Sequence, residues 1–214
     1  NVGEPTHNIL LPAGIVSGNL LIFGAVFAAD VGIGTITWPA GWTQILETGT
    51  DPIVSIRYRI ADGGEGASIN VTTASSAFHA ASALRITGAH ASQAPEGASA
   101  TGISTTWDAP NLDPAGWAAE DTLWLANLGL GTANGQATPG TPTSYAAVTN
   151  HSAFNGALSY LFSRDLNAAA EDPASAATND VSQTWIATTL AIRPAAGGGA
   201  GSLAPQRGLM GVGL

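Results

Sequence analysis

The 214-residue chain contains no cysteine and no lysine. Without thiols it can form neither a disulfide nor a thiolate nucleophile, so cysteine chemistry is excluded. The six basic residues are all arginines and face 15 acidic residues, which gives a formal net charge of −9. Because phosphate contacts by basic side chains dominate nucleic-acid affinity, we expect no nucleic-acid partner. The same charge disfavours binding to anionic membranes.

Charged residues are scarce altogether, at 10% of the chain against 45% hydrophobic residues. Globular domains usually contain about a quarter of charged residues. Alanine, threonine, serine, glycine and asparagine fill the difference. We therefore expect a folded chain with a neutral surface of small side chains, long enough to bury a sizeable core.

Short apolar or alternating runs are separated by glycine, proline, aspartate and asparagine, a pattern typical of a β-sandwich or barrel. The predicted strands are 20–28, 34–38, 43–48, 53–61, 68–73, 77–87, 103–107, 122–130, 144–148, 156–163 and 184–192. Helical signals are weak, with one possible turn at 167–171 and another at 114–119. Residues 9–29 are apolar enough to resemble a secretory signal, but no basic region precedes them and they contain Pro12 and Gly18. We interpret the run 19–28 as a buried strand.

The second half of the chain resembles the first. Leu20-Leu21-Ile22-Phe23 aligns with Leu123-Trp124-Leu125-Ala126, and 39–43 aligns with 142–146, both at a separation of 103 residues. The same separation aligns Asp62 with Asp165, and a separation of 106 aligns 84–86 with 190–192. A register held over several segments indicates a shared strand plan. We predict an antiparallel β-sandwich, jelly-roll-like, built from two pseudo-repeated halves.

The domain prediction follows from this repeat. Each half, about 10–90 and 103–194, has one thin apolar face, so we expect the two to stack as a single domain over residues 1–194. Residues 91–102 are expected to form an exposed connection, and 131–143 a second long loop. Residues 195–202 have the composition of a flexible glycine-rich linker.

An apolar segment follows that linker at residues 203–214. It is either a frayed terminus or an arm that docks on a neighbouring subunit by strand addition. Under the second interpretation, the partner-binding residues are Leu203, Leu209, Met210, Val212 and Leu214.

We find no pattern of catalytic or metal-binding residues in the sequence, and we predict no catalytic residue, no cofactor and no metal. The histidines, His7, His79, His90 and His151, lack zinc-ligand spacing, and His79 is expected to be packed in a strand. Neither acid pair, Glu120-Asp121 or Glu171-Asp172, is a ready acid/base couple, because adjacent strand residues point to opposite faces. Since acidic side chains are usually exposed, we expect both pairs in solvated loops.

Two further features leave alternatives open. The run Asp62-Gly63-Gly64-Glu65-Gly66 is typical of a tight turn, with calcium binding through Asp62 and Glu65 as the alternative. Among the six tryptophans, Trp42, Trp124 and Trp185 are expected in the core. The other three, Trp38, Trp107 and Trp117, adjoin expected loops and could be exposed for stacking on sugars.

Three segments carry a resemblance to a known group of proteins: Leu11-Pro12-Ala13-Gly14 with Ser17-Gly18-Asn19-Leu20-Leu21-Ile22, then Trp38-Pro39-Ala40-Gly41-Trp42-Thr43, then 55–62. They resemble a pattern in structural proteins of tailed bacteriophages, in which Asp is usual where this chain has Asn19. The resemblance covers residues 10–90 and, through the repeat, 10–194. It implies a non-enzymatic virion protein, most simply a capsid decoration (cement) protein at the capsid surface. The implied partners are the major capsid protein or other virion subunits, and further copies of the chain in a homo-oligomer.

Two other functions remain open. A sugar- or receptor-binding module of a phage fibre or tail predicts exposed aromatic side chains in one groove. An enzyme predicts clustered acids, or a histidine with a carboxylate partner, in one cleft.

Overall fold

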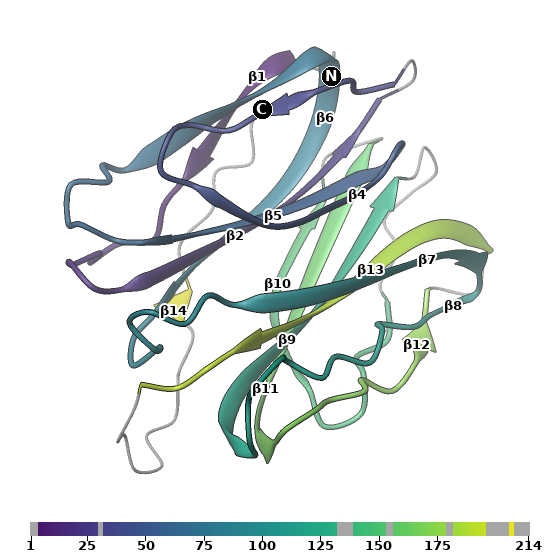
Figure 1. The fold of residues 1–214 in the computed structure, drawn as a ribbon. Coiled ribbons are helices and arrows are strands. Elements are labelled where there is room, and N and C mark those ends of the chain that lie inside the picture. Colours follow the sequence, from purple (N-terminus) through teal and green to yellow (C-terminus); the bar gives the residue numbers. More distant parts are fainter. Residues whose placement is uncertain are drawn as a thin grey trace.

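The computed structural model describes residues 4–29, 32–131, 139–152, 156–178, 182–195 and 206–207. Every regular element in these ranges is a β-strand, which confirms the all-β prediction (Figure 1). The strands are β1 (Glu4–Leu10), β2 (Leu20–Ala28), β3 (Ile36–Thr37), β4 (Thr43–Gly49), β5 (Ile53–Ile60), β6 (Ser68–Ile86), β7 (Glu96–Ser104), β8 (Thr106–Trp107), β9 (Glu120–Gly131), β10 (Ala146–Ser152), β11 (Ala157–Ala168), β12 (Ala176–Ala177), β13 (Gln183–Ile192) and β14 (Gln206–Arg207). The described residues contain no helix that could cross a membrane.

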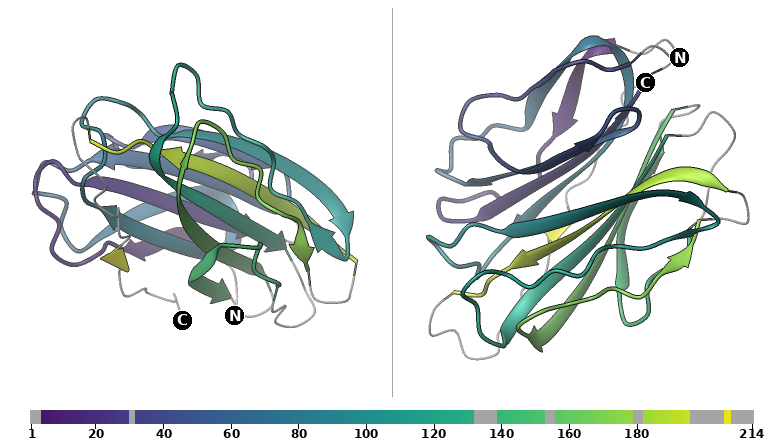
Figure 2. Two further views of the ribbon diagram at one scale, coloured as in Figure 1. Left: turned by 90° about the horizontal axis from the view of Figure 1, so that it is seen from below. Right: turned by 45° about the vertical axis from the view of Figure 1, so that its right-hand side comes forward.

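Two antiparallel sheets make up most of the fold. The first has the order β1-β6-β2-β5-β4, and β3 and β14 also pair with β6. The second has the order β10-β11-β9-β13-β7, and β8 pairs with β12 beside it. Figure 2 shows the two sheets as separate layers, one from each half of the chain. Apart from β14, the chain therefore completes the first sheet before it begins the second.

The sheets share one apolar layer. Leu20, Ile22 and Val26 of β2 lie in the same buried cluster as Leu123 and Leu125 of β9. A hydrogen bond of 2.8 Å between the hydroxyls of Ser82 and Thr149 also joins them. Because side chains alternate between the two faces of a strand, this layer takes every second residue of the central strands.

Each sheet buries its outer face as well. All nine residues of β2 are buried, because Leu21, Phe23 and Phe27 pack in a second cluster with Ile33 and Trp42 of the connection between β2 and β4. In the second sheet a third cluster joins β9 and β13 to the connection that carries β8. Two long connections thus cover the sheets, and this explains how a chain with so few charges buries so much apolar surface.

The two sheets have corresponding strand orders, β4-β5-β2-β6-β1 and β10-β11-β9-β13-β7. The register of β4 on β5 shifts around Ile45, and that of β10 on β11 shifts around Val148, which is 103 residues later. Leu20 pairs with Ile86 and Leu123 with Ile192, so the separation of 106 expected for the last strands matches the ladders.

One part of the sequence alignment is wrong by two residues. Leu20 pairs with Ile60 in the first sheet, and Leu123 pairs with Asp165 in the second. Asp165 therefore occupies the place of Ile60 rather than that of Asp62. The strand β11 also continues to Ala168, where a helical turn was expected.

Other expectations were wrong in the connections. The expected helical turn at 114–119 is a non-helical turn closed by the Trp117 amide on the Pro114 carbonyl at 3.4 Å. The expected loop 91–102 contains most of β7, which pairs with β13 along nine residues. The two strands expected at 68–73 and 77–87 are one continuous strand, β6.

Candidate functional site

The glutamate of each acid pair in the sequence is bound by an arginine, and the two contacts involve different arginines. Glu120 accepts two hydrogen bonds from Arg193, one of them from Nε at 2.9 Å, and the guanidinium holds the pKa of that carboxyl below its ordinary value. Glu171 is 7% exposed and accepts a bond of 2.8 Å from Arg164. Each of these two carboxylates is thus neutralised by its own arginine, so neither is free to serve as a general base.

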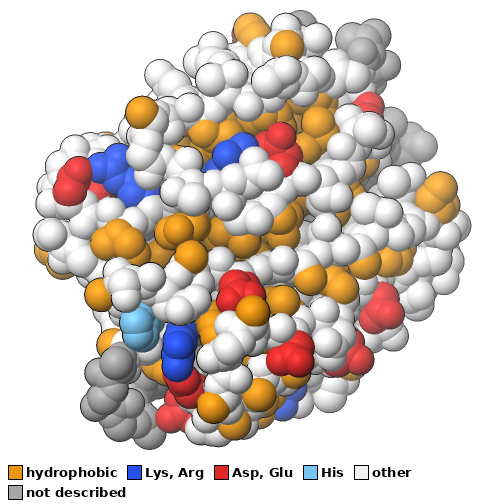
Figure 3. Space-filling view, in the orientation of Figure 1, with side chains coloured by type: hydrophobic (Ala, Val, Ile, Leu, Met, Phe, Trp, Pro, Cys, Tyr) orange, Lys and Arg blue, Asp and Glu red, His pale blue; other side chains and the backbone are white. Residues whose placement is uncertain are grey.

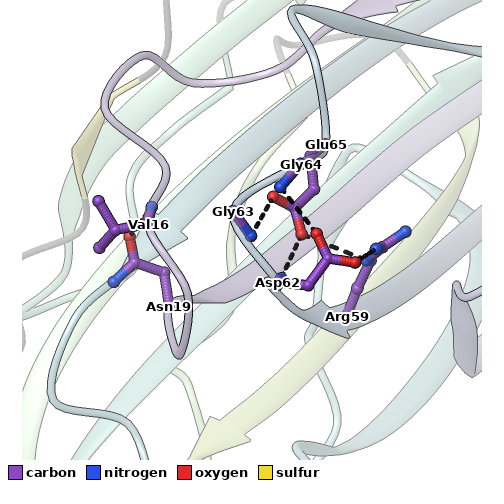
Figure 4. A network of polar contacts seen from close by, with 7 residues as sticks. All are labelled: Val16, Asn19, Arg59, Asp62, Gly63, Gly64 and Glu65. Atoms are coloured by element: carbon purple, nitrogen blue, oxygen red, sulfur yellow. Dashed lines mark hydrogen bonds and ion pairs between the residues drawn. The ribbon is translucent and has the colours of Figure 1, made fainter.

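The side chains of Asp62, Glu65 and Arg59 form a network of polar contacts with one another and with the backbone of the turn (Figure 4). The Arg59 guanidinium lies 2.5 Å from Asp62 Oδ2 and 3.4 Å from Glu65 Oε1. Backbone amides of Asp62 and Gly63 donate to Glu65 at 2.6 and 3.0 Å, and that of Gly64 donates to Asp62 at 2.7 Å. This last bond is the main reason that the pKa of Asp62 is lowered.

All four carboxylate oxygens of Asp62 and Glu65 therefore have a donor from the chain. The arrangement is that of a tight turn, and it offers no free oxygen for calcium. Nowhere in the described ranges do three or more acidic or histidine side chains gather as a metal site.

His7 and His79 form a pair that sequence reasoning missed. His7 is 1% exposed, and its Nδ1 lies 3.0 Å from Nδ1 of His79. Its Nε2 lies 3.0 Å from the hydroxyl of Thr73, which itself donates to the Ser75 carbonyl at 2.7 Å. Because the Thr73 proton is used in that bond, His7 Nε2 donates to Thr73 and His7 Nδ1 accepts from His79.

The histidine pair joins β1 to β6, with His7 buried and His79 partly buried, and the His7 ring lies 5.1 Å from that of Phe27. Burial is the main cause that lowers the pKa of His7 to about 4, and the charge of His79 acts in the same direction. Burial also lowers the pKa of His79. The arrangement holds β1 in place, as expected for a packed His79.

The tryptophan side chains are too deeply buried to stack on a sugar, which the sugar-binding hypothesis requires. Trp107 is fully buried and stacks on Phe162 at 5.6 Å, and Trp117 is 9% exposed. Trp38 is partly buried, with its ring edge-on to Phe23. Trp107 and Trp117, for which the sequence left exposure open, are buried because the connection that carries them folds onto the outer face of the second sheet. Trp42, Trp124 and Trp185 lie in the core as predicted.

A small cavity lies between the sheets, lined by Gly24, Ser82 and Asn127 among aliphatic side chains, with about 10 Å³ of room for the centre of a water molecule. That space fits one water and no organic ligand. Asn127 is 2% exposed, and its amide oxygen has no partner among the described residues. The cavity is therefore too small to be a substrate pocket.

The strongest candidate for an interaction site is one edge of β6. On its first edge β6 pairs with β2 and β3. On its second edge it pairs with β1 between Ser68 and Ala77, and with β14 at Leu84 and Arg85. Along this second edge, no described residue pairs with 78–83. We call this stretch the open edge of β6, and an open edge is a template for a further strand.

The predicted partner-binding residues Leu203, Leu209, Met210, Val212 and Leu214 lie outside the described residues, as do 196–202 of the linker. Between them, Gln206 and Arg207 are described, and they form β14 on β6 of the same chain. Sequence reasoning missed the open edge because it divided β6 at 74–76. The signal was present, since no glycine or proline interrupts the chain between Ser68 and Ile86.

Comparison with known proteins gives no relative: no family model, no curated protein and no solved structure matches this chain.

Proposed function

We propose that this chain is a non-enzymatic virion structural protein, a capsid decoration (cement) protein that binds neighbouring capsid subunits at the capsid surface and stabilises them. Its partners are the major capsid protein or other virion subunits, together with further copies of itself in a homo-oligomer. The work of such a protein is burial of surface between subunits, which requires a stiff body and a way to reach its neighbours.

The proposal rests on three features together: a two-sheet body with covered outer faces, a stretch of β6 (78–83) that no described residue pairs on its second edge, and an apolar sequence at 203–214 that follows a glycine-rich stretch. The body uses its ionic side chains internally, since Arg57, Arg59, Arg164 and Arg193 are each paired with an acid. Hydrophobic side chains also gather in a band across the middle of one face, between the sheets (Figure 3). Apolar surface and strand edges are what protein partners bind.

The resemblance to phage structural proteins supports the proposal through residues that have defined places in the fold. Gly41 has a φ of 87°, which favours glycine, and it turns the chain so that Trp42 packs edge-on against Phe23 at 5.6 Å. Asn19 accepts a hydrogen bond of 3.1 Å from the amide of Val16 and closes the turn before β2 (Figure 4). These residues form the first sheet and the connection that packs on its outer face. The sequence pattern therefore supports the fold more strongly than it supports the function as a virion protein.

We further propose that the fold is a β-sandwich of two halves with a common strand plan. The corresponding strand orders, the register shifts at Ile45 and Val148, and the separation of 106 between the last strands support it. The chain order does not support jelly-roll winding, because, apart from the two residues of β14, each sheet is built from one half of the chain.

The sugar- or receptor-binding alternative receives no support from the tryptophans. It requires aromatic rings exposed in one groove, and all six tryptophans are at least partly buried.

The proposal is tested on particles of the phage that encodes the chain. We expect the full-length protein to co-purify with particles through a density gradient, as detected by mass spectrometry. A variant that ends at Ser202 should lose at least tenfold in occupancy while its circular dichroism stays unchanged. Absence of the full-length protein from particles contradicts the proposed function, and equal occupancy of the two forms contradicts the role of the arm.

A further inference from the structure

The edge strand β7 differs from the other strands that end the two sheets. Among the described residues, the first sheet ends at β1 and β4, and the second at β10 and β7. The registers of β1, β4 and β10 on their neighbours all shift, whereas β7 pairs with β13 along nine residues without a shift. Bulges, prolines and lysines are common means by which proteins keep edge strands from pairing with other chains. The strand β7 contains none of them, so its edge is regular and unprotected.

The second edge of β7 is accessible. No described residue pairs with it. Apart from Glu96 and Ile103, the strand has only small side chains. Among the described large apolar side chains Ile103 is the most exposed, at 74%. Since an edge strand presents unpaired N–H and C=O groups, a further strand can pair with β7 along its whole length.

The inner face of β7 is covered by the first sheet at one end only. A methyl group on Gly97 would lie 3.0 Å from Ile45 and 3.1 Å from Leu46 of β4, so Gly97 faces the layer between the sheets. Side chains alternate along a strand, so Ile103 points to the same side, yet it is exposed. In Figure 1 both β4 and β7 form the near edges of their sheets, and the apolar band of Figure 3 lies between them.

We propose that β7 is a homodimer interface, at which β7 of a second copy pairs in antiparallel orientation about a two-fold axis at Ala100. Ala100 is the middle residue of the nine, so this register pairs the whole strand. Opposite residues are equally far from Ala100, and Ile103 of each copy therefore lies opposite Gly97 of the other. The sheet with the order β10-β11-β9-β13-β7 continues across the axis into the same sheet of the second copy.

The edge is complementary to itself in shape. Opposite residues of paired strands point to the same face, with Cβ atoms about 4.5–5.5 Å apart. The side chain of Ile103 would thus fill the space beside Gly97 of the other copy, next to Ile45 and Leu46. These two are only partly buried and pack against the cluster between the sheets. Pairing therefore removes from water both the exposed Ile103 and part of the apolar band.

The charges of the strand are compatible with a second copy in this orientation. The chain has a net charge of −9, so two copies repel each other in general. The one charged residue of β7 is Glu96, which accepts a hydrogen bond of 3.1 Å from the Ala115 amide. In the antiparallel pair it lies opposite Ser104, so the two Glu96 residues are about 27 Å apart at about 3.4 Å per residue. This distance exceeds the screening length of about 8 Å at physiological ionic strength.

The inference gives the homo-oligomer of the proposed function a defined interface, but it is argued from β7 alone. Its test uses the full-length protein in solution without particles, so its failure is distinct from a failure to bind capsids. Sedimentation velocity at micromolar concentrations should show a dimer, with twice the monomer mass of 21.4 kDa.

Ile103→Lys should raise the dissociation constant of the dimer at least tenfold, because it places a charge on the edge opposite Gly97. Val16→Lys is the matched control, since it makes the same change of charge at another exposed apolar residue, 57% exposed and outside β7. It should leave the dissociation constant within about twofold. A monomer at all concentrations, or equal effects of the two substitutions, overturns the proposal.

Single cysteines test the register, because the natural chain contains no cysteine. In Ala100→Cys the new thiol lies opposite its own copy, with Cα atoms about 4.5–5.5 Å apart, within the range of a disulfide. Ile103→Cys is the control: the side chain is more exposed, but its two copies lie about 20 Å apart in this register. In a glutathione buffer, Ala100→Cys should form disulfide-linked dimers at least tenfold faster. An equal or faster rate for Ile103→Cys, as random collision would give, overturns the proposed pairing.

Discussion

Acidification should weaken the attachment of β1 to β6 before it affects the rest of the fold. His7 is buried and bonded on both ring nitrogens, to His79 and to Thr73. A proton added to Nδ1 of His7 would place two N–H groups against each other across 3.0 Å. Stability should therefore depend on the neutral form of the ring.

The magnitude follows from the pKa of His7, which burial lowers from 6.5 to about 4. Because the folded-state pKa lies below the unfolded one, the unfolded chain binds more protons between these values. The contribution is fully present above pH 6.5 and is lost as the pH falls toward 4. Linkage at 1.36 kcal/mol per pKa unit gives a loss of about 2 kcal/mol between pH 7.5 and 5, and about 3 kcal/mol by pH 4.

The assay is urea unfolding followed by tryptophan fluorescence, at several values between pH 7.5 and 5. Asp62 and Glu120 contribute little in this interval, since their pKa values are lowered from ordinary values of 3.8 and 4.5. His7→Gln provides the matched comparison, because the amide can still donate to Thr73 but does not titrate. Its unfolding free energy should fall less steeply with acid than that of the natural protein. A pH-independent unfolding free energy in the natural protein, or equal slopes in both proteins, would show that the His7 ring does not control stability in acid.

Three further substitutions probe other parts of the structure. Trp107→Ala should cost about 3–5 kcal/mol in urea unfolding because the ring is fully buried, and a loss under 1 kcal/mol would argue against the covered second sheet. Glu65→Gln should cost about 1 kcal/mol by weakening the contact with Arg59, and millimolar calcium should leave the melting temperature of both proteins unchanged. A rise in melting temperature on addition of calcium would support the hypothesis of a calcium site at Asp62 and Glu65. Asn19→Asp places a carboxylate where Arg85 Nη1 lies 3.4 Å away, and should add about 1 kcal/mol at pH 7 that disappears as the new carboxyl is protonated. No gain would show that this contact is not formed in solution.

The central strands could be predicted from sequence because two independent signals agreed. Leu20–Ala28 is an apolar run, interrupted only by Gly24, between turn residues, and its bounds match β2. Thr43 begins β4 directly after the glycine turn at Gly41, as the pattern indicates. Where burial on both faces and turn chemistry mark the same boundaries, local sequence is sufficient.

The edge strand β7 could not be predicted in the same way. Its sequence, Glu96 to Ser104, is dominated by glycine, alanine, serine and threonine, and resembles a loop. Its conformation comes from nine pairs with β13, that is, from residues about 90 positions away along the chain. Strand preference depends strongly on such neighbours, so composition alone is misleading here.

The sequence left the burial of Trp107 and Trp117 open for a related reason. Trp107 and Trp117 adjoin turn residues, which indicates exposure when each is considered alone. The connection between β7 and β9 instead folds back over the second sheet, where Trp107 meets Phe162 and Thr189 donates to the Pro110 carbonyl at 2.6 Å. Likewise the contact of His7 with His79 joins residues 72 positions apart in the sequence, and no local sequence pattern predicts it.

The proposed role at the capsid surface can be tested by a particle reconstruction with electron cryomicroscopy, at a resolution that separates strands. We expect the two-sheet body on the outer capsid surface, in contact with at least two capsid subunits. Density for the body elsewhere in the particle, or particles that carry none of it, would contradict the proposal that the protein works by joining capsid subunits.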